Sequence, residues 1–350
     1  MTNPLKEKRV TDIAAWLLLP VLMTVILKQL SFLFIPLSIA VLIVYVLGFP
    51  LDYLKQYKVP GYARIGIVVL FVLVIFYLIG RLVSVNIEEF QNQLPALETK
   101  FWEYARWGLA SADISQDQAR EIISSFFRNI GQEDIKPLGN ILQKVSGSFF
   151  SFLGNLIWVL LFMVFILAER DKFSHRLLDA FGEEKAGPIR DSFLNVNKAV
   201  QHYLGLKTLV SFITGALAAL ILWLFDVPFA LLWGVLTFLL NYIPNIGSLV
   251  ATIPPVAIAL FESGSIGKTL VIALILTSIQ MTVGNIIEPK VMGKGLNLSP
   301  LVVILSLIFW GWMWGITGMF VSVPLTAALK IGLEQLDSTR PIAILMSGGK

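Results

Sequence analysis

The sequence predicts an all-α polytopic membrane protein, from its composition and from the spacing of its apolar runs. The chain has 350 residues, of which 56% are hydrophobic and 14% are charged. A soluble domain contains about 45–50% apolar and about 25% charged residues, so the excess apolar surface here must face lipid. The mean hydropathy of +0.78 indicates one polytopic membrane domain. We expect about 7–8 transmembrane helices, with broken or re-entrant segments and a small helical insertion outside the membrane.

The N-terminal region, 1–85, predicts transmembrane helices that begin with an uncleaved signal anchor. Lys6, Lys8 and Arg9 precede the first apolar run, as in a signal peptide, but no small-x-small cleavage site follows. The second run begins almost at once, so we expect the first two runs to pair as a hairpin. The apolar runs of this region are 13–27, 30–51 and 65–80.

Basic residues near the ends of the runs predict the orientation. They gather at 6–9, 55–64 and 170–176, which we therefore place in the cytoplasm. The segment 86–148 has six basic and nine acidic residues and is expected outside. Both chain termini are then cytoplasmic. The basic residues are scattered beside the apolar runs, where they act as signals of membrane topology, and this accounts for the net charge of +4. Because they form no concentrated patch, we expect no binding of nucleic acid.

Two polar insertions interrupt the apolar pattern. In the outer one, 86–148, an amphipathic stripe runs to Tyr104, Pro95 must break or kink its helix, and Ser115 with Gln118 predicts the cap of a second helix. This helical hairpin is better explained by packing than by ligand binding. A transmembrane helix, 149–168, follows it. The inner insertion, 169–207, predicts amphipathic interfacial helices, one of which opens at Pro188.

The region 208–335 predicts a transport core, and 336–350 a cytoplasmic tail. The run 249–261 is short for a span and contains Pro254 and Pro255, so it is expected to be re-entrant or broken. The run 301–329 is long enough for two short helices. Ser211, Gly215 and Ala219 have the small-xxx-small spacing that predicts close helix contact. The apolar runs are 208–225, 227–243, 249–261, 269–287 and 301–329.

Polar residues in this core gather at two predicted helix breaks, 241–248 and 285–300. Interrupted helices expose backbone groups, which transporters use to hold substrates near the middle of the membrane. A polar face leads into the second break, although an ordinary interhelical hydrogen-bonding face is the alternative explanation. The predicted substrate pathway is Asn241, Asn245, Ser248, Thr277, Gln280, Asn285 and Glu288. The predicted break or gating residues are Pro244, Gly247, Pro254, Pro255, Pro289, Gly293, Gly295 and Pro300.

The composition also excludes several kinds of chemistry. There is no cysteine, and His175 and His202 are both expected to be interfacial side chains rather than ligands. The segment 264–269 has only two residues between its glycines and no preceding strand, so it does not match a phosphate-binding loop. No Gly-x-Ser-x-Gly motif is present, and no histidine lies in an apolar run. We expect no enzyme activity, no cofactor, no metal and no nucleotide.

Four stretches carry a resemblance to a known family: 242–247, 285–289 with 292–293, 298–301 and 318–324. They resemble the signature stretches of the autoinducer-2 exporter family, and the resemblance extends over nearly the whole chain. It implies a homo-oligomeric, pentameric protein of the bacterial inner membrane that exports the quorum-sensing signal autoinducer-2. That signal is small and rich in hydroxyl groups, which suits asparagine and serine partners.

Three functions remain open at this point. The first is export of autoinducer-2 or a similar small polar metabolite, either proton-coupled or by facilitated diffusion. The second is sodium/proton antiport, with which some members of the family are associated. Many relatives carry an acidic residue at position 241; the asparagine here argues against antiport and leaves Glu288 as the main titratable group. The third is a membrane scaffold that carries no flux.

Overall fold

The computed structural model describes residues 18–19, 21–110, 154, 156–170, 172–244, 246–292, 296–334 and 338–348. Within these ranges the chain is helical apart from turns and one antiparallel β-bridge between Leu298 and Ser347, which confirms the all-α fold. Five helices there are long and apolar enough to cross a membrane, or six with one bent pair. The second helix expected in the outer insertion lies outside the described residues.

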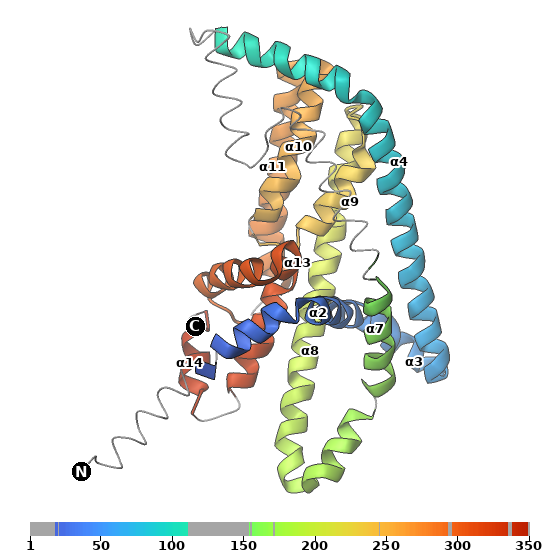
Figure 1. Cartoon of the computed structure of the whole chain (residues 1–350), viewed down its shortest axis with the longest axis vertical. Helices are drawn as coiled ribbons and strands as arrows, with labels where there is room; N and C mark the ends of the chain where they lie inside the picture. Colours follow the sequence, from blue (N-terminus) through green and yellow to red (C-terminus); the bar gives the residue numbers. More distant parts are fainter. Residues whose placement is uncertain are drawn as a thin grey trace, which may run out of the picture. The chain divides into compact units, whose positions relative to one another are not determined.

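The chain forms two compact units. Unit 1 comprises Met1–Val68, Leu156–Thr208 and Met292–Lys350, and unit 2 comprises Val69–Asn155 and Leu209–Val291. The boundary at Val291 divides the region 208–335 that we expected as one core. The helices, labelled in Figure 1, are α2 Ser31–Val46, α3 Gly48–Gln56, α4 Gly61–Ala110, α7 Leu156–Arg170, α8 Phe173–Leu224, α9 Ala230–Leu240, α10 Ile246–Ser263, α11 Ile266–Thr282, the π-helix η1 Val283–Ile287, α12 Glu288–Met292, α13 Pro300–Glu334 and α14 Arg340–Leu345.

The long helices α4 and α8 each combine segments that were predicted from the sequence as separate elements. α4 continues unbroken past Pro95, and its ribbon bends partway along its length in Figure 1. α8 includes both the inner insertion and the following span. Its one non-helical residue is Gly182, at φ +71°, so its second part begins before Pro188.

The N-terminal pair differs from the expected hairpin. The helix Val21–Gln29 and α2 are bent by 88° across the single residue Leu30. The Leu30 amide still donates to the Ile26 carbonyl at 2.9 Å. One residue that retains a helical hydrogen bond does not provide the loop that an antiparallel hairpin needs, so the pair is a broken span or a re-entrant loop.

The break expected in 249–261 is absent, and the one expected at 285–300 begins only after Met292, because the helices accommodate Pro254, Pro255 and Pro289. α10 runs through Pro254 and Pro255, and its 18 residues make it a candidate span. In the preceding turn, the Thr252 hydroxyl donates to the Ser248 carbonyl at 2.8 Å. The helix from Ile266 to Met292 is likewise unbroken. There η1 widens the backbone just before Pro289, whose ring would otherwise clash with the carbonyl four residues earlier.

The prediction of two short helices in 301–329 is confirmed, because α13 is a folded hairpin within unit 1. Trp314 and Gly315 interrupt it, with Gly315 at φ +62°. The Trp310 indole donates to the Thr326 hydroxyl at 3.1 Å. These residues would lie about 24 Å apart in a straight helix, so 316–334 must fold back on 300–313. The Trp314 indole at the tip donates to the Leu27 carbonyl at 3.1 Å.

Residues 338–348, within the predicted tail 336–350, pack inside unit 1. α14 follows α13, and Ala343 is fully buried. Beyond α14, the Ser299 amide donates to the Met346 carbonyl at 2.9 Å, and the Gly348 amide donates to the Asn297 carbonyl at 3.3 Å. The segment before Pro300, which opens α13, is therefore paired with the chain beyond α14. Gly293 and Gly295 lie outside the described residues.

In unit 2, α8 and α9 pack closely against each other. This confirms the close helix contact predicted from the small-xxx-small spacing of Ser211, Gly215 and Ala219. A Cβ atom on Gly215 would lie 2.6 Å from the Gly234 carbonyl oxygen, and one on Gly234 would lie 2.5 Å from the Ala219 Cβ. The backbones therefore meet where neither helix carries a side chain. Next to this crossing, Leu222, Leu232 and Ile258 belong to the buried core that joins α8, α9, α10 and α11.

We predict that Gly234→Ala destabilises the protein, because the added methyl group would clash with Ala219. Overpacking of this kind costs about 1–3 kcal/mol. The matched control is Gly66→Ala in α4, where nothing lies within 4 Å of the added atom, and where alanine stabilises a helix by about 0.5–1 kcal/mol. Thermal unfolding of the purified protein in detergent measures both effects. Equal melting temperatures for the two variants would contradict the close crossing.

Candidate functional site

The candidate site in unit 2 begins at a true helix break, between α9 and α10. α9 has 11 residues and is about 16 Å long, which is too short to cross a bilayer. The chain then turns through Asn241–Pro244 before α10 begins at Ile246. Gly247 is required there, because a Cβ atom at this position would overlap the Leu240 carbonyl. Pro244 thus lies in the turn and Gly247 in the first turn of α10, whereas Asn245 lies outside the described residues.

Asn241 and Ser211 form a buried polar pair at this break. The Asn241 side-chain amide donates to the Ser211 hydroxyl at 3.0 Å, and the two residues are 9% and 0% exposed. Asn241 follows the last residue of α9, while Ser211 lies on α8. The bond uses one amide hydrogen, so the asparagine oxygen can still accept a hydrogen bond and the serine hydroxyl can still donate one.

Two further hydroxyl groups are buried on the same two helices. Thr237 lies one turn before Asn241 and is 2% exposed, and Thr214 lies one turn after Ser211 and is fully buried. The Thr214 hydroxyl donates to the Val210 carbonyl at 2.8 Å. These four side chains are uncharged and combine hydrogen-bond donors with acceptors. Such a set suits a neutral or hydroxyl-rich solute better than a simple ion.

The other predicted pathway residues lie on α10 and on the helix from Ile266 to Met292. Ser248 is half-buried in the first turn of α10, and Gln280 and Glu288 are half-buried on the longer helix. Thr277 and Asn285 are exposed, so they do not line the interior of unit 2. The π-turn inserts one residue between Gln280 and Glu288, which rotates Glu288 by about 100° from the face predicted for a regular helix.

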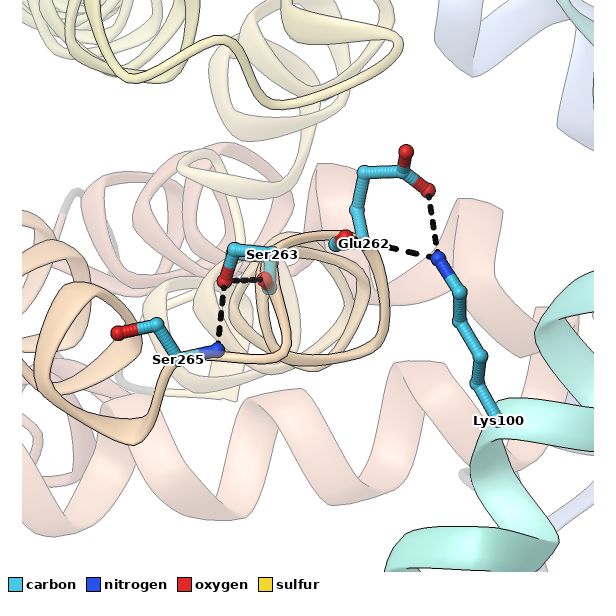
Figure 2. Close-up of polar contacts among 5 residues, drawn as sticks. Lys100, Glu262, Ser263 and Ser265 are labelled. Carbon is cyan, nitrogen blue, oxygen red and sulfur yellow. Dashed lines mark hydrogen bonds and ion pairs between the residues drawn. The ribbon is translucent and has the colours of Figure 1, made fainter.

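A separate polar cluster lies at the opposite end of α10, where Figure 2 shows Lys100 of α4 beside Glu262. The Lys100 ammonium lies 3.7 Å from the Glu262 carboxylate and 3.5 Å from its carbonyl oxygen. A cation at a helix C-terminus interacts favourably with the helix dipole. Both side chains are more than a third exposed, so the pair contributes about 0–1 kcal/mol. It holds the distal part of α4 at the turn between α10 and α11.

The glycine-containing segment 264–269 is a helix cap. The Ser265 hydroxyl accepts from the Lys268 amide at 3.3 Å and begins α11, and the Ser265 amide donates to the Ser263 hydroxyl (Figure 2). This is the loop between helices that the sequence predicted. Across the described ranges, no group of three or more His, Asp or Glu residues could hold a metal ion.

Sequence reasoning missed two features of the polar interior. It used Ser211 only as a small packing residue, although Ser211 and Thr214, three residues apart, already mark a polar face on an apolar helix. It also missed Lys330, just beyond the run 301–329, whose exposed fraction is only 3%. A lysine at a helix end normally reaches water, so its position gave no signal.

Comparison with known proteins places the chain among membrane transporters. The model of the AI-2E family transporter matches residues 17–338. The AI-2 transport protein TqsA of Escherichia coli K12 is 35% identical over 324 residues, which cover 89% of each chain. A Haemophilus influenzae protein, provisionally named a transport protein, is 37% identical over 303 residues, or 84% of each chain. The E. coli protein YhhT, named in the same provisional way, is 48% identical over 153 residues, or 44% of each chain.

We predict that Ser211 and Asn241 are energetically coupled. Hydrogen bonds between membrane helices contribute about 0.6 kcal/mol on average and about 1.7 kcal/mol at most, so a double-mutant cycle should give a value in this range. The cycle compares Ser211→Ala, Asn241→Ala and the double variant in reversible unfolding from mixed micelles. Ser211→Ala combined with Thr252→Ala, whose hydroxyl bonds within α10, is the control and should be additive. If the effects of Ser211→Ala and Asn241→Ala on the free energy of unfolding were additive, the hydrogen bond between the two residues would contribute nothing to stability.

Proposed function

Because the chain belongs to the AI-2E transporter family, we propose that it exports autoinducer-2 or a similar small, hydroxyl-rich metabolite. The family and the membrane-spanning helices make it a multi-pass membrane transport protein. The observation that carries the choice of substrate is the buried, uncharged pair of Asn241 and Ser211 at the break after α9. The name of the E. coli relative, an AI-2 transport protein, supports the same substrate.

The geometry suggests how such a solute is held. A solute hydroxyl can donate to the free oxygen of Asn241 and accept from the Ser211 hydroxyl, so one hydroxyl satisfies both groups. Because polar groups in lipid are costly unless they are paired, the Asn241–Ser211 bond satisfies one amide hydrogen of Asn241 and the Ser211 oxygen when the site is empty. The solute uses the groups that this bond leaves unused, so the bond can persist while the solute is bound. Ser248, in the first turn of α10, is placed to extend the site.

The exposed polar residues support an oligomer. Thr277 and Asn285 are exposed on a helix whose most apolar 18-residue window has a mean hydropathy of 2.0. Polar groups on such a helix are favoured where another protein surface or a water-filled path covers them. We place this helix against a neighbouring copy, in the pentamer that the family resemblance implies. The proposed location is the bacterial inner membrane, with both termini in the cytoplasm.

Sodium/proton antiport remains the second candidate because of one observation. Glu288 is a half-buried carboxylate on a membrane helix, where ionisable residues often serve ion pathways. If antiport is the function, Glu288→Gln should abolish sodium-dependent proton movement, and that movement should not depend on autoinducer-2. Under the export proposal, the wild-type protein carries autoinducer-2 in the absence of sodium.

We predict that efflux of autoinducer-2 from loaded proteoliposomes depends on the Asn241 site. Loss of one buried hydrogen bond, about 1.4 kcal/mol, should reduce the flux about tenfold in Asn241→Ala and in Ser211→Ala. Asn285→Ala tests the exposed polar residues on the helix from Ile266 to Met292. The control is Asn86→Ala in α4, whose amide donates to its own helix at Leu82 and should have no effect.

The assay is run with and without a pH gradient, so that proton coupling is separated from passive flux. Unchanged efflux in the Asn241→Ala, Ser211→Ala double variant would refute this site. An absence of flux for the wild-type protein, with or without the gradient, would favour the scaffold hypothesis.

A further inference from the structure

Unit 1 contains a lysine ammonium that is enclosed by protein near the end of an apolar helix. Lys330, in the second arm of α13, is 3% exposed. Its ammonium lies 2.9 Å from the carboxylate of Glu334, one turn later on the same helix. Lysines near the ends of membrane helices usually extend toward water. The enclosure of Lys330 means that this charge is fixed within the protein.

A second buried lysine belongs to the same packing interface. Lys207 of α8 is 4% exposed. It follows Leu204 by three residues, as Lys330 follows Ala327 by three, and Leu204 and Ala327 are members of one buried cluster. Residues three apart on a helix share a face. Lys207 and Lys330 are therefore two buried lysines on the faces of α8 and α13 that contribute to this cluster in unit 1.

The carboxylate that neutralises Lys330 is the more accessible partner. The Glu334 side chain is 38% exposed, whereas that of Lys330 is 4% exposed. Glu334 can therefore rotate into solvent, while the ammonium remains in place. A charge left alone in a buried position is strongly unfavourable, so another anion must replace the carboxylate whenever it leaves.

A hydroxyl group lies next to this charge. Thr326 is one turn before Lys330 and is 6% exposed. Its oxygen accepts the Trp310 indole hydrogen, so its own hydrogen remains available as a donor. An ammonium and a hydroxyl donor on one helix face match an oxyanion, which accepts several hydrogen bonds and carries the opposite charge.

We propose that Lys207 and Lys330 bind a small oxyanion at the contact between α8 and α13, in place of the Glu334 carboxylate. The ligand is either a free inorganic anion or the acidic group of a small organic solute. Its binding site is separate in chemistry from the uncharged Asn241–Ser211 pair. The proposal does not depend on export of autoinducer-2, because it concerns anion binding by the purified protein.

The test uses the full-length protein in detergent, with inorganic phosphate as the probe and sodium chloride at matched ionic strength as the reference. Phosphate should raise the melting temperature of the wild-type protein in a saturable way, which gives an apparent Kd. Lys330→Gln and Lys207→Gln should each weaken that Kd about tenfold, since each removes one charge-assisted hydrogen bond. Lys268→Gln, a half-buried lysine of unit 2, is the control and should leave the Kd unchanged.

Glu334→Gln is the decisive variant, because its expected effect is tighter binding of phosphate, which misfolding cannot produce. It removes the competing carboxylate, so phosphate should bind about tenfold more tightly than to the wild-type protein. A carboxylate probe, lactate, is titrated in parallel, and binding of lactate alone would assign the site to the acidic group of an organic solute. Equal stabilisation of all variants by phosphate, or unchanged affinity in Glu334→Gln, would overturn the proposal.

Discussion

The constraint on which this structure depends is that backbone groups inside a membrane must be paired within the protein. Wherever a helix is interrupted, a side chain or a neighbouring backbone covers the groups that become free. At the bend after Gln29, the Leu27 carbonyl receives the indole of Trp314. At the end of α9, the turn bonds internally and Gly247 lies directly against Leu240. The first break is therefore stabilised by a residue distant in the sequence. The second depends on a glycine, whose lack of a side chain lets two backbone segments meet.

The same constraint explains why polar residues are found where they are. Ser211 is fully buried and pairs with Asn241 at the turn between α9 and α10 in unit 2. In unit 1, Thr326 pairs with Trp310 across the α13 hairpin. Both bonds connect a helix to an element that has turned or ended.

The sequence predicted the all-α membrane fold and the division of 301–329, because apolar length and a glycine at the turn are local signals. It did not predict which prolines interrupt a helix. Pro244 lies in a real break, whereas Pro255 lies within α10 and Pro289 follows a π-turn. A proline removes the same amide in all three places. Whether the helix widens or ends depends on the surrounding packing, which a single sequence does not state.

The candidate site was predictable only in part, for a related reason. Asn241 stood out because it precedes a proline in an apolar region, but its partner Ser211 is 30 residues away and resembled a packing residue. Lys330 gave no signal because burial, and not residue type, distinguishes it from an ordinary interfacial lysine. The two units therefore offer different chemistry, an uncharged pair in one and fixed positive charge in the other. A transporter with both features can bind a hydroxyl-rich solute at the uncharged Asn241–Ser211 pair. The positively charged groups proposed to bind an anion belong to a different part of the chain.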